Sequence, residues 1–176
     1  MYEGLKIVLW PDPRLRKVSQ PIEKIDDTTA ALATRMFELM REHHGVGLAA
    51  PQVGLNVRLF VTNPTGEPGD DHVYINPQLS DAEDETDAEE GCLSLPGINA
   101  HILRSKSLKI RAQGLDGQWF EEKSDEFPAR VWQHEFDHLN GTMLMDRMGP
   151  ADKILAKKKL RELEEDWAAA HPKARK

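Results

Sequence analysis

The chain has 176 residues, of which 39% are hydrophobic and 30% are charged, and its formal net charge at pH 7 is −7. This length suits one domain of ordinary size, and the composition excludes both a membrane-embedded chain and one too polar to fold. The single cysteine excludes an intrachain disulfide and any site built from several thiolates. The acidic balance argues against broad nucleic-acid binding, which needs a basic face.

The net charge is concentrated in residues 81–90, which read DAEDETDAEE. Seven of these ten residues are acidic, and the 23 other acidic residues equal the lysines and arginines in number. The run ends just before the only cysteine, Cys92. Because charge runs are usually solvated, we expect residues 81–89 to form an exposed loop.

The N-terminal sequence MYEGLKIVLWPDPRL has a short apolar run that two prolines interrupt. It lacks the basic start, long apolar core and small-residue cleavage site of a secretory signal. No stretch approaches 18 apolar residues, so we expect no membrane span. These features predict a cytoplasmic protein whose thiol stays reduced.

In the N-terminal half, apolar residues at helical spacing predict a helix over residues 27–44. Residues 45–54, GVGLAAPQVG, hold too many glycines and prolines for a regular element. Alternating polarity predicts a strand over residues 55–62, and residues 73–76 are expected to form another.

In the C-terminal half, residues 108–112 and 118–122 flank an Asp-Gly turn and predict a hairpin. Apolar spacing predicts helices over residues 124–140 and 151–170. Strands mixed with segregated helices, without βαβ alternation, predict an α+β fold.

The strongest chemical feature is an HExxH motif, His134-Glu135-Phe136-Asp137-His138, on the first of these two helices. Residues four apart share a helix face, so both imidazoles can bind one metal. Glu135 can then touch a metal-bound water without being a ligand, and a divalent metal lowers the pKa of that water toward about 7.

A catalytic site of this kind needs a third protein ligand, and the pattern leaves several candidates. A metzincin is excluded because Leu144 stands where the third histidine would be. Glu162, Glu164 and Glu165 are available downstream, in a charged pattern typical of a solvated helix face. Cys92 is the remaining candidate, in a glycine-containing segment with polar neighbours.

Three segments together resemble the peptide deformylases. Residues 45–52, GVGLAAPQ, match that family's GxGxAAxQ; residues 90–94 match its EGCLS; residues 133–139, QHEFDHL, match its QHExDHL. Their order and spacing agree, and the likeness covers roughly residues 6–147. Three motifs in order are far more specific than HExxH alone.

The resemblance implies a single catalytic domain over residues 1–176, with mostly antiparallel strands around a central HExxH helix and helices toward both ends. It implies a hydrolase that removes the N-formyl group from N-formylmethionyl peptides of nascent proteins and releases formate. We expect a cytoplasmic monomer without membrane or specific nucleic-acid partners.

The resemblance also implies the metal site. Its ligands are Cys92, His134 and His138, its natural ion is Fe²⁺, and Zn²⁺, Ni²⁺ or Co²⁺ are possible substitutes. Glu135 takes a proton from the attacking water and delivers it to the departing amine.

The remaining implied roles concern the substrate. The backbone N–H of Leu93 and the side-chain amide of Gln52 stabilise negative charge on the formyl oxygen. Arg104 pairs with Glu90 to hold the metal loop. The residues expected to bind the substrate backbone and methionine side chain are Val46, Gly47, Leu93, Val131 and the edge of His134.

Two other functions remain open at this level. One is an HExxH protease whose third ligand is a C-terminal glutamate, and the other is a non-catalytic peptide-binding module. The basic residues of the last helix suit weak contact with ribosomal RNA or, more simply, a solvated amphipathic helix; they are Lys157, Lys158, Lys159 and Arg161.

Overall fold

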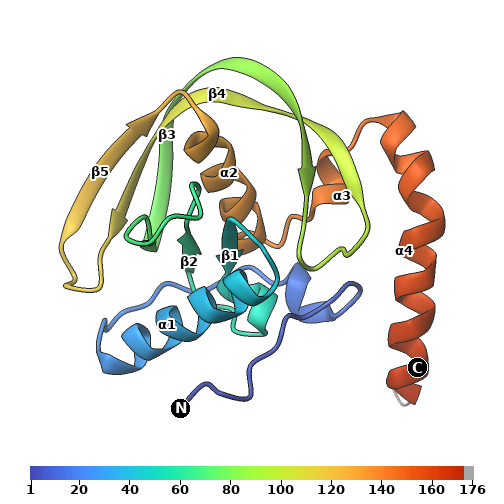
Figure 1. The fold of residues 1–176 in the computed structure, drawn as a ribbon, viewed down its shortest axis with the longest axis horizontal. Coiled ribbons are helices and arrows are strands. Elements are labelled where there is room, and N and C mark those ends of the chain that lie inside the picture. The colour runs from blue at the N-terminus through green and yellow to red at the C-terminus, as the bar shows by residue number, and fades with distance from the viewer. Residues whose placement is uncertain (173–176) are drawn as a thin grey trace.

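The computed structural model describes residues 1–172 as an α+β fold, which confirms the predicted class (Figure 1). In chain order its elements are η1 (Pro13–Arg16), α1 (Asp27–Glu42), β1 (Gly47–Ala49), η2 (Ala50–Val53), β2 (Leu59–Thr62), β3 (His72–Gly91), β4 (Asn99–Gln113), β5 (Trp119–Ser124), α2 (Phe127–Leu139), α3 (Leu144–Arg147) and α4 (Pro150–Ala170). Within the described part, no helix is long and apolar enough to cross a membrane.

The five strands form one antiparallel sheet in the order β1-β2-β3-β4-β5. Figure 1 shows β3 and β4 as a long curved arch above α2, with α1 below and α4 at the right edge. The HExxH helix therefore lies centrally, between the arch and the short strands β1 and β2. This arrangement matches the expected sheet around a central helix.

The expectation of a loop over residues 81–89 is wrong, because these residues belong to strand β3. Glu83 pairs in register with Ser107, and Asp87 pairs with Leu103. Most of this stretch is exposed, so its acidic side chains remain in water while the backbone is hydrogen-bonded to β4. A register shift lies between Ser80 and Glu83, which increases local curvature.

Residues 45–54 also contain more regular structure than expected. Gly47–Ala49 form strand β1, which pairs with β2, and Ala50–Val53 form the short 3-10 helix η2. Glycines and prolines are compatible with both elements here because β1 is an edge strand and Pro51 lies in the first turn of η2.

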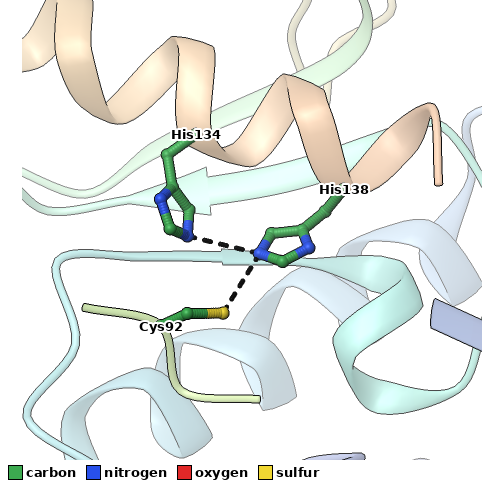
Figure 2. A group of neighbouring side chains, drawn as sticks. All are labelled: Cys92, His134 and His138. Atoms are coloured by element: carbon green, nitrogen blue, oxygen red, sulfur yellow. Dashed lines mark hydrogen bonds between the residues drawn. The ribbon is translucent and has the colours of Figure 1, made fainter. Parts of the chain in front are cut away.

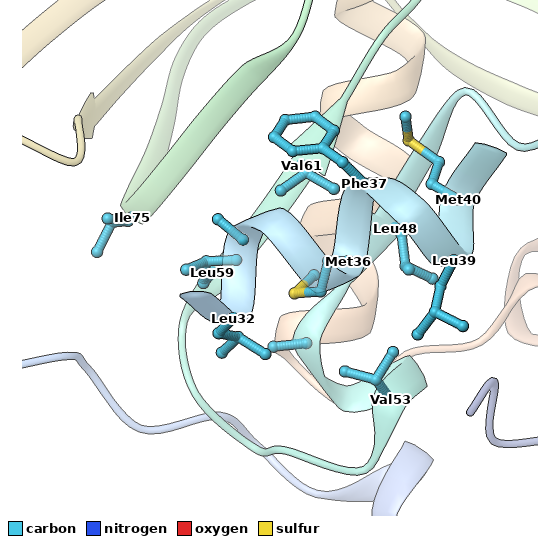
Figure 3. Packing of buried hydrophobic residues seen from close by; sticks show 12 residues of the cluster. Leu32, Met36, Phe37, Leu39, Met40, Leu48, Val53, Leu59, Val61 and Ile75 are labelled. Atoms are coloured by element: carbon cyan, nitrogen blue, oxygen red, sulfur yellow. The ribbon is translucent and has the colours of Figure 1, made fainter. Parts of the chain in front are cut away.

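Three apolar clusters hold the elements together. One face of α1 packs onto β1, β2 and η2, with Met36 completely buried (Figure 3). A second cluster joins the sheet to α2 and includes Trp132, which is 3% exposed as a core residue would be. In the third cluster, α3 and α4 pack against β4. The ends of α2 and β3 are thus fixed from several sides.

Candidate metal centre and active site

Helix α2 presents the two histidines of the motif on one face. It begins with Pro128 in its first turn, where a missing N–H costs little, and it ends at Leu139 before Gly141, whose φ is +71°. His134 and His138 are one turn apart, so their imidazole rings meet edge to face with centroids 5.0 Å apart.

Cys92 reaches these rings from the segment that directly follows β3 (Figure 2). Its Sγ lies 3.4 Å from Nε2 of His138, which in turn lies 3.3 Å from Nε2 of His134. The three ligand atoms are all within 4.8 Å of one another. The sequence-predicted ligands therefore come together, although Cys92 is 42 positions from His134 in the chain.

The distances and donor types fit a tetrahedral metal ion. With metal–nitrogen bonds of about 2.05 Å and metal–sulfur bonds of about 2.3 Å, ligand atoms in such a site lie about 3.3–3.6 Å apart. The observed separations of 3.3 and 3.4 Å agree with this spacing. Three protein ligands leave a fourth position for water or substrate, as catalytic sites require.

Glu90 holds His134 from the side opposite the ligand group. Nδ1 of His134 lies 2.9 Å from Oε2 of Glu90, so Nε2 is the nitrogen that faces Cys92. Arg104 donates to both oxygens of Glu90, at 2.6 and 2.9 Å, which confirms the expected pair. Such a carboxylate fixes the tautomer and orientation of a metal-binding imidazole.

The electrostatics of the group favour a bound cation. Burial would raise the pKa of Glu90, but contacts with His134 and Arg104 outweigh burial and lower this pKa to about 2. Burial opposes a charged His134, yet contacts with Cys92 and Glu90 raise the pKa of His134 to about 10. Burial lowers the pKa of His138 well below its ordinary value, so this ring is neutral and can donate an electron pair to a metal ion. The proton that Glu90 and Cys92 favour on His134 is one that a metal ion would displace, because a ligating imidazole must be neutral.

Glu135 is buried next to the ligand group and lies against the backbone of Gly47. A Cβ atom at Gly47 would lie only 2.4 Å from Oε1 of Glu135. Oε2 of Glu135 is buried and has no hydrogen-bond partner among the described residues. Burial raises the pKa of Glu135 to about 7, although nearby His134 and Arg104 favour its charged form. A carboxyl group with this pKa can both take and give a proton near neutral pH.

Gln52 places its amide group beside Cys92. Its Oε1 accepts from the backbone N–H of Ala49 at 2.9 Å, which fixes which end of the amide points toward the thiol. Nε2 lies 3.6 Å from Sγ of Cys92 and 3.3 Å from the hydroxyl of Ser94. Gln52 is 1% exposed, so η2 holds a non-titrating donor rigidly at the ligand group.

A cavity of about 490 Å³ opens onto this group. Val46 forms part of its exposed rim, whereas Val131 is buried in its wall. Every residue predicted to bind substrate lines this cavity: Val46, Gly47, Leu93, Val131 and His134. Gly47 belongs to edge strand β1, beside which an extended peptide can lie.

The downstream glutamates lie elsewhere and do not join the ligand group. Glu162 accepts from Lys159, Glu164 from Trp10 and Glu165 from Arg161. All three carboxylates belong to the surface helix α4 and bind partners other than the ligand group. None of them is therefore available as the third metal ligand that an HExxH protease would need.

Sequence reasoning missed two charged residues of α2 that support the site. Asp137 accepts from Arg104 at 2.9 Å, and Arg130 donates to Glu90 at 2.7 Å. Arginine is usually exposed, and the partners of Arg130 are 28 to 44 positions away. Only the packing of α2 beneath β3 and β4 brings them together.

Comparison with known proteins agrees with this geometry. The family model described as polypeptide deformylase matches residues 4–153. Peptide deformylase of Thermotoga neapolitana is 45% identical over 159 residues, which cover 90% of this chain and 95% of that protein. Peptide deformylase 1B of Arabidopsis thaliana, chloroplastic/mitochondrial, is 45% identical over 154 residues, covering 86% of this chain and 56% of that protein.

Solved structures show the same fold. A plant peptide deformylase, PDF1B, superposes with a TM-score of 0.94 at 40% identity and covers 98% of this chain and 95% of its own. Peptide deformylase from Thermotoga maritima superposes with a TM-score of 0.79 at 42% identity, covering 83% of this chain and 98% of that one. The chain therefore belongs to the polypeptide deformylase family of metal-dependent hydrolases, whose activity is the removal of the formyl group from N-formylmethionyl peptides.

Proposed function

We propose that Cys92, His134 and His138 hold one Fe²⁺ ion and that Glu135 carries the proton during hydrolysis of the formyl amide. The observation that carries this proposal is the approach of one sulfur and two nitrogen atoms within 4.8 Å, next to a buried carboxyl group. A bound divalent ion supplies Lewis acidity, which lowers the pKa of water and polarises a carbonyl group.

Glu135 moves the proton. Its carboxylate accepts a proton as water adds to the formyl carbon, and returns it to the amine nitrogen as the carbon–nitrogen bond breaks. Formate and a free N-terminal amine are then released. A pKa of about 7 suits both steps, because the group is readily protonated and deprotonated near neutral pH.

Gln52 and Leu93 stabilise the charge that develops on the formyl oxygen. The position of Gln52 supports this role, because its amide nitrogen is fixed beside Cys92 and the segment that continues into Leu93. Backbone and amide donors placed in advance at a developing oxyanion contribute about 3–4 kcal/mol each.

The cavity positions the peptide. Val46, Leu93, Val131 and the edge of His134 surround the methionine side chain, and Gly47 aligns the substrate backbone along β1. The absence of a side chain at Gly47 leaves room for both Glu135 and an extended peptide.

We further infer the setting of the activity. The chain acts as one catalytic domain, as a monomer and in the cytoplasm, on formylated nascent peptides. Weak ribosome contact is assigned to α4, whose basic residues include Lys157 and Lys158. Arg161 and Lys159 pair closely with acids of the same helix, at 2.8 and 3.2 Å, whereas Lys158 lies 4.0 Å from Glu162. Lys157→Glu with Lys158→Glu is therefore the variant to test by co-sedimentation with ribosomes. Unchanged co-sedimentation would remove this assignment.

The catalytic proposal is tested by anaerobic purification, metal analysis and measurement of formate release from formyl-methionyl peptides. Anaerobic handling protects a ferrous site with a thiolate ligand. We expect about one iron per chain, and we expect Glu135→Gln to keep this iron while kcat falls by about 10²–10⁴-fold. An active Glu135→Gln enzyme would overturn the role of Glu135, and a folded enzyme that binds peptide without releasing formate would indicate a binding module.

A further inference from the structure

A buried network of ion pairs lies behind the ligand group. It contains a second arginine, Arg130, besides Arg104. Glu90 accepts from Arg104 of β4 and also from Arg130 of α2. Arg104 also donates to Asp137, which accepts a second hydrogen bond from Arg147 of α3. Arg104, Arg130 and Glu90 are each less than 10% exposed, so water does little to screen these contacts.

Arg130 joins three elements through one guanidinium group. Its Nη1 donates to Oε1 of Glu90 at 2.7 Å and to the carbonyl of Ile102 at 2.9 Å. Its Nη2 donates to the carbonyl of Thr86 at 2.7 Å. The side chain of Arg130 therefore fixes β3 and β4 to the helix that carries both histidines.

Arg130 and His134 hold the same carboxylate from one face of α2. They are four residues apart, so they lie one helical turn from each other. Arg130 binds Oε1 of Glu90, and His134 contacts Oε2 of the same residue. Each oxygen of Glu90 is thereby held by a different side chain of α2, with Oε2 directed at the imidazole of His134.

Arg104 alone would hold Glu90 less firmly with respect to the helix. Arg104 comes from β4 and divides its donors between Glu90 and Asp137. Arg104 therefore reaches α2 only through Asp137, whereas Arg130 belongs to α2 itself and bonds Glu90 directly, one turn from His134. Removing Arg130 would leave Oε1 with Arg104 as its remaining donor and would remove the direct bond that holds Glu90 in place relative to α2.

We propose that Arg130 is a positioning residue that acts through Glu90 to orient His134 and so strengthens metal binding. This inference rests on the proposed metal site, and it assigns to Arg130 an effect on metal affinity in addition to its packing role. Groups that orient metal ligands in this way typically change metal affinity or activity by 10–100-fold when removed.

The test compares Arg130→Met, Arg130→Lys and a control, Arg35→Met. Arg35 is a partly buried arginine, 20% exposed, that donates to two carboxylates and a backbone carbonyl, but it lies on α1, away from the site. Affinity for Co²⁺ is measured by competition with a chelator, alongside kcat, KM and the thermal unfolding midpoint. Arg130→Met is expected to raise the Kd for Co²⁺ by about 10-fold or more, with Arg130→Lys intermediate and Arg35→Met within twofold of wild type.

Several outcomes would overturn the proposal. An unchanged Kd in Arg130→Met with a lower unfolding midpoint would show a purely structural role, and a change in KM alone would show that Arg130, which lines the cavity, acts on substrate binding and not on the metal site. If Arg130→Met does not fold, an unchanged Kd in Arg130→Lys overturns the proposal by itself. The proposed function fails separately, if the wild-type protein binds Co²⁺ but releases no formate.

Discussion

Replacing Gly47 by alanine is expected to displace Glu135 without disturbing the metal ligands. The new Cβ would lie 2.4 Å from Oε1, 2.9 Å from Cδ and 3.0 Å from Cγ of Glu135. Because carbon and oxygen atoms require about 3.4 Å, the carboxyl group must retreat by about 1 Å. The three close contacts involve most of the side chain, so rotation of its last bond does not relieve them.

The size of the effect follows from the required accuracy of proton transfer. A misplacement of about 1 Å in a catalytic group can lower the rate by about 100-fold, which corresponds to about 2.7 kcal/mol in the activation free energy. Gly47 lies in β1 without a positive φ, so alanine can adopt its backbone conformation. A fall in kcat would therefore report the collision with Glu135 and not backbone strain.

The assay measures formate release from a formyl-methionyl peptide together with the metal content of each preparation. We expect Gly47→Ala to keep its metal and lose about 100-fold in kcat. Gly4→Ala serves as the matched control, because a Cβ at Gly4 meets no atom within 4 Å. A Gly47→Ala enzyme with full metal and wild-type kcat would refute the assignment of Glu135 as a proton carrier in this position.

Three further predictions concern the metal, the core and the pH dependence of stability. Cys92→Ser should lower metal affinity at least 10-fold, because a hydroxyl replaces the thiolate donor; equal metal retention in equilibrium dialysis would contradict this. Met36→Ala removes a completely buried side chain and should lower the free energy of unfolding by about 2–5 kcal/mol in urea titrations, with kcat per folded enzyme unchanged. Hydrogen bonds from Arg14 lower the pKa of Asp12, so this residue stabilises the fold above about pH 4 and loses its effect as pH falls. Asp12→Asn should therefore cost about 0.5–1 kcal/mol at pH 7 and less at pH 3, and an equal cost at both would exclude this ion pair as the source.

Local periodicity is sufficient to predict the three long helices α1, α2 and α4, including the two histidines of α2, but not the one-turn helix α3. Residues 124–140 were expected to be helical, and the helix spans Phe127–Leu139. The position of Cys92 beside His138 depends on long-range packing, and only the resemblance of the three motifs predicts it. Spacing alone had left the downstream glutamates as alternative third ligands.

The acidic strand shows why the remaining structure could not be predicted from local sequence. Sequence patterns indicate a strand when one face is buried, but residues 81–89 of β3 are exposed or half-buried on both faces. Asp81 pairs with Lys109 of β4 and Glu83 with Lys123 of β5, so basic residues of the same sheet offset part of the repulsion. This pairing depends on sequence separations of 28 and 40 residues, beyond the reach of a local pattern.

The double attachment of β3 to α2 has a consequence for how the metal enters the protein. Glu90 and Arg130 join the same two elements only two and four residues away from the ligands Cys92 and His134. The segment between β3 and α2, which contains β4 and β5, is therefore already closed by sheet pairing and by this ion pair, and its closure entropy does not have to be met by metal coordination. We therefore expect one divalent ion to exchange for another through local opening at the cavity, with the rest of the fold intact.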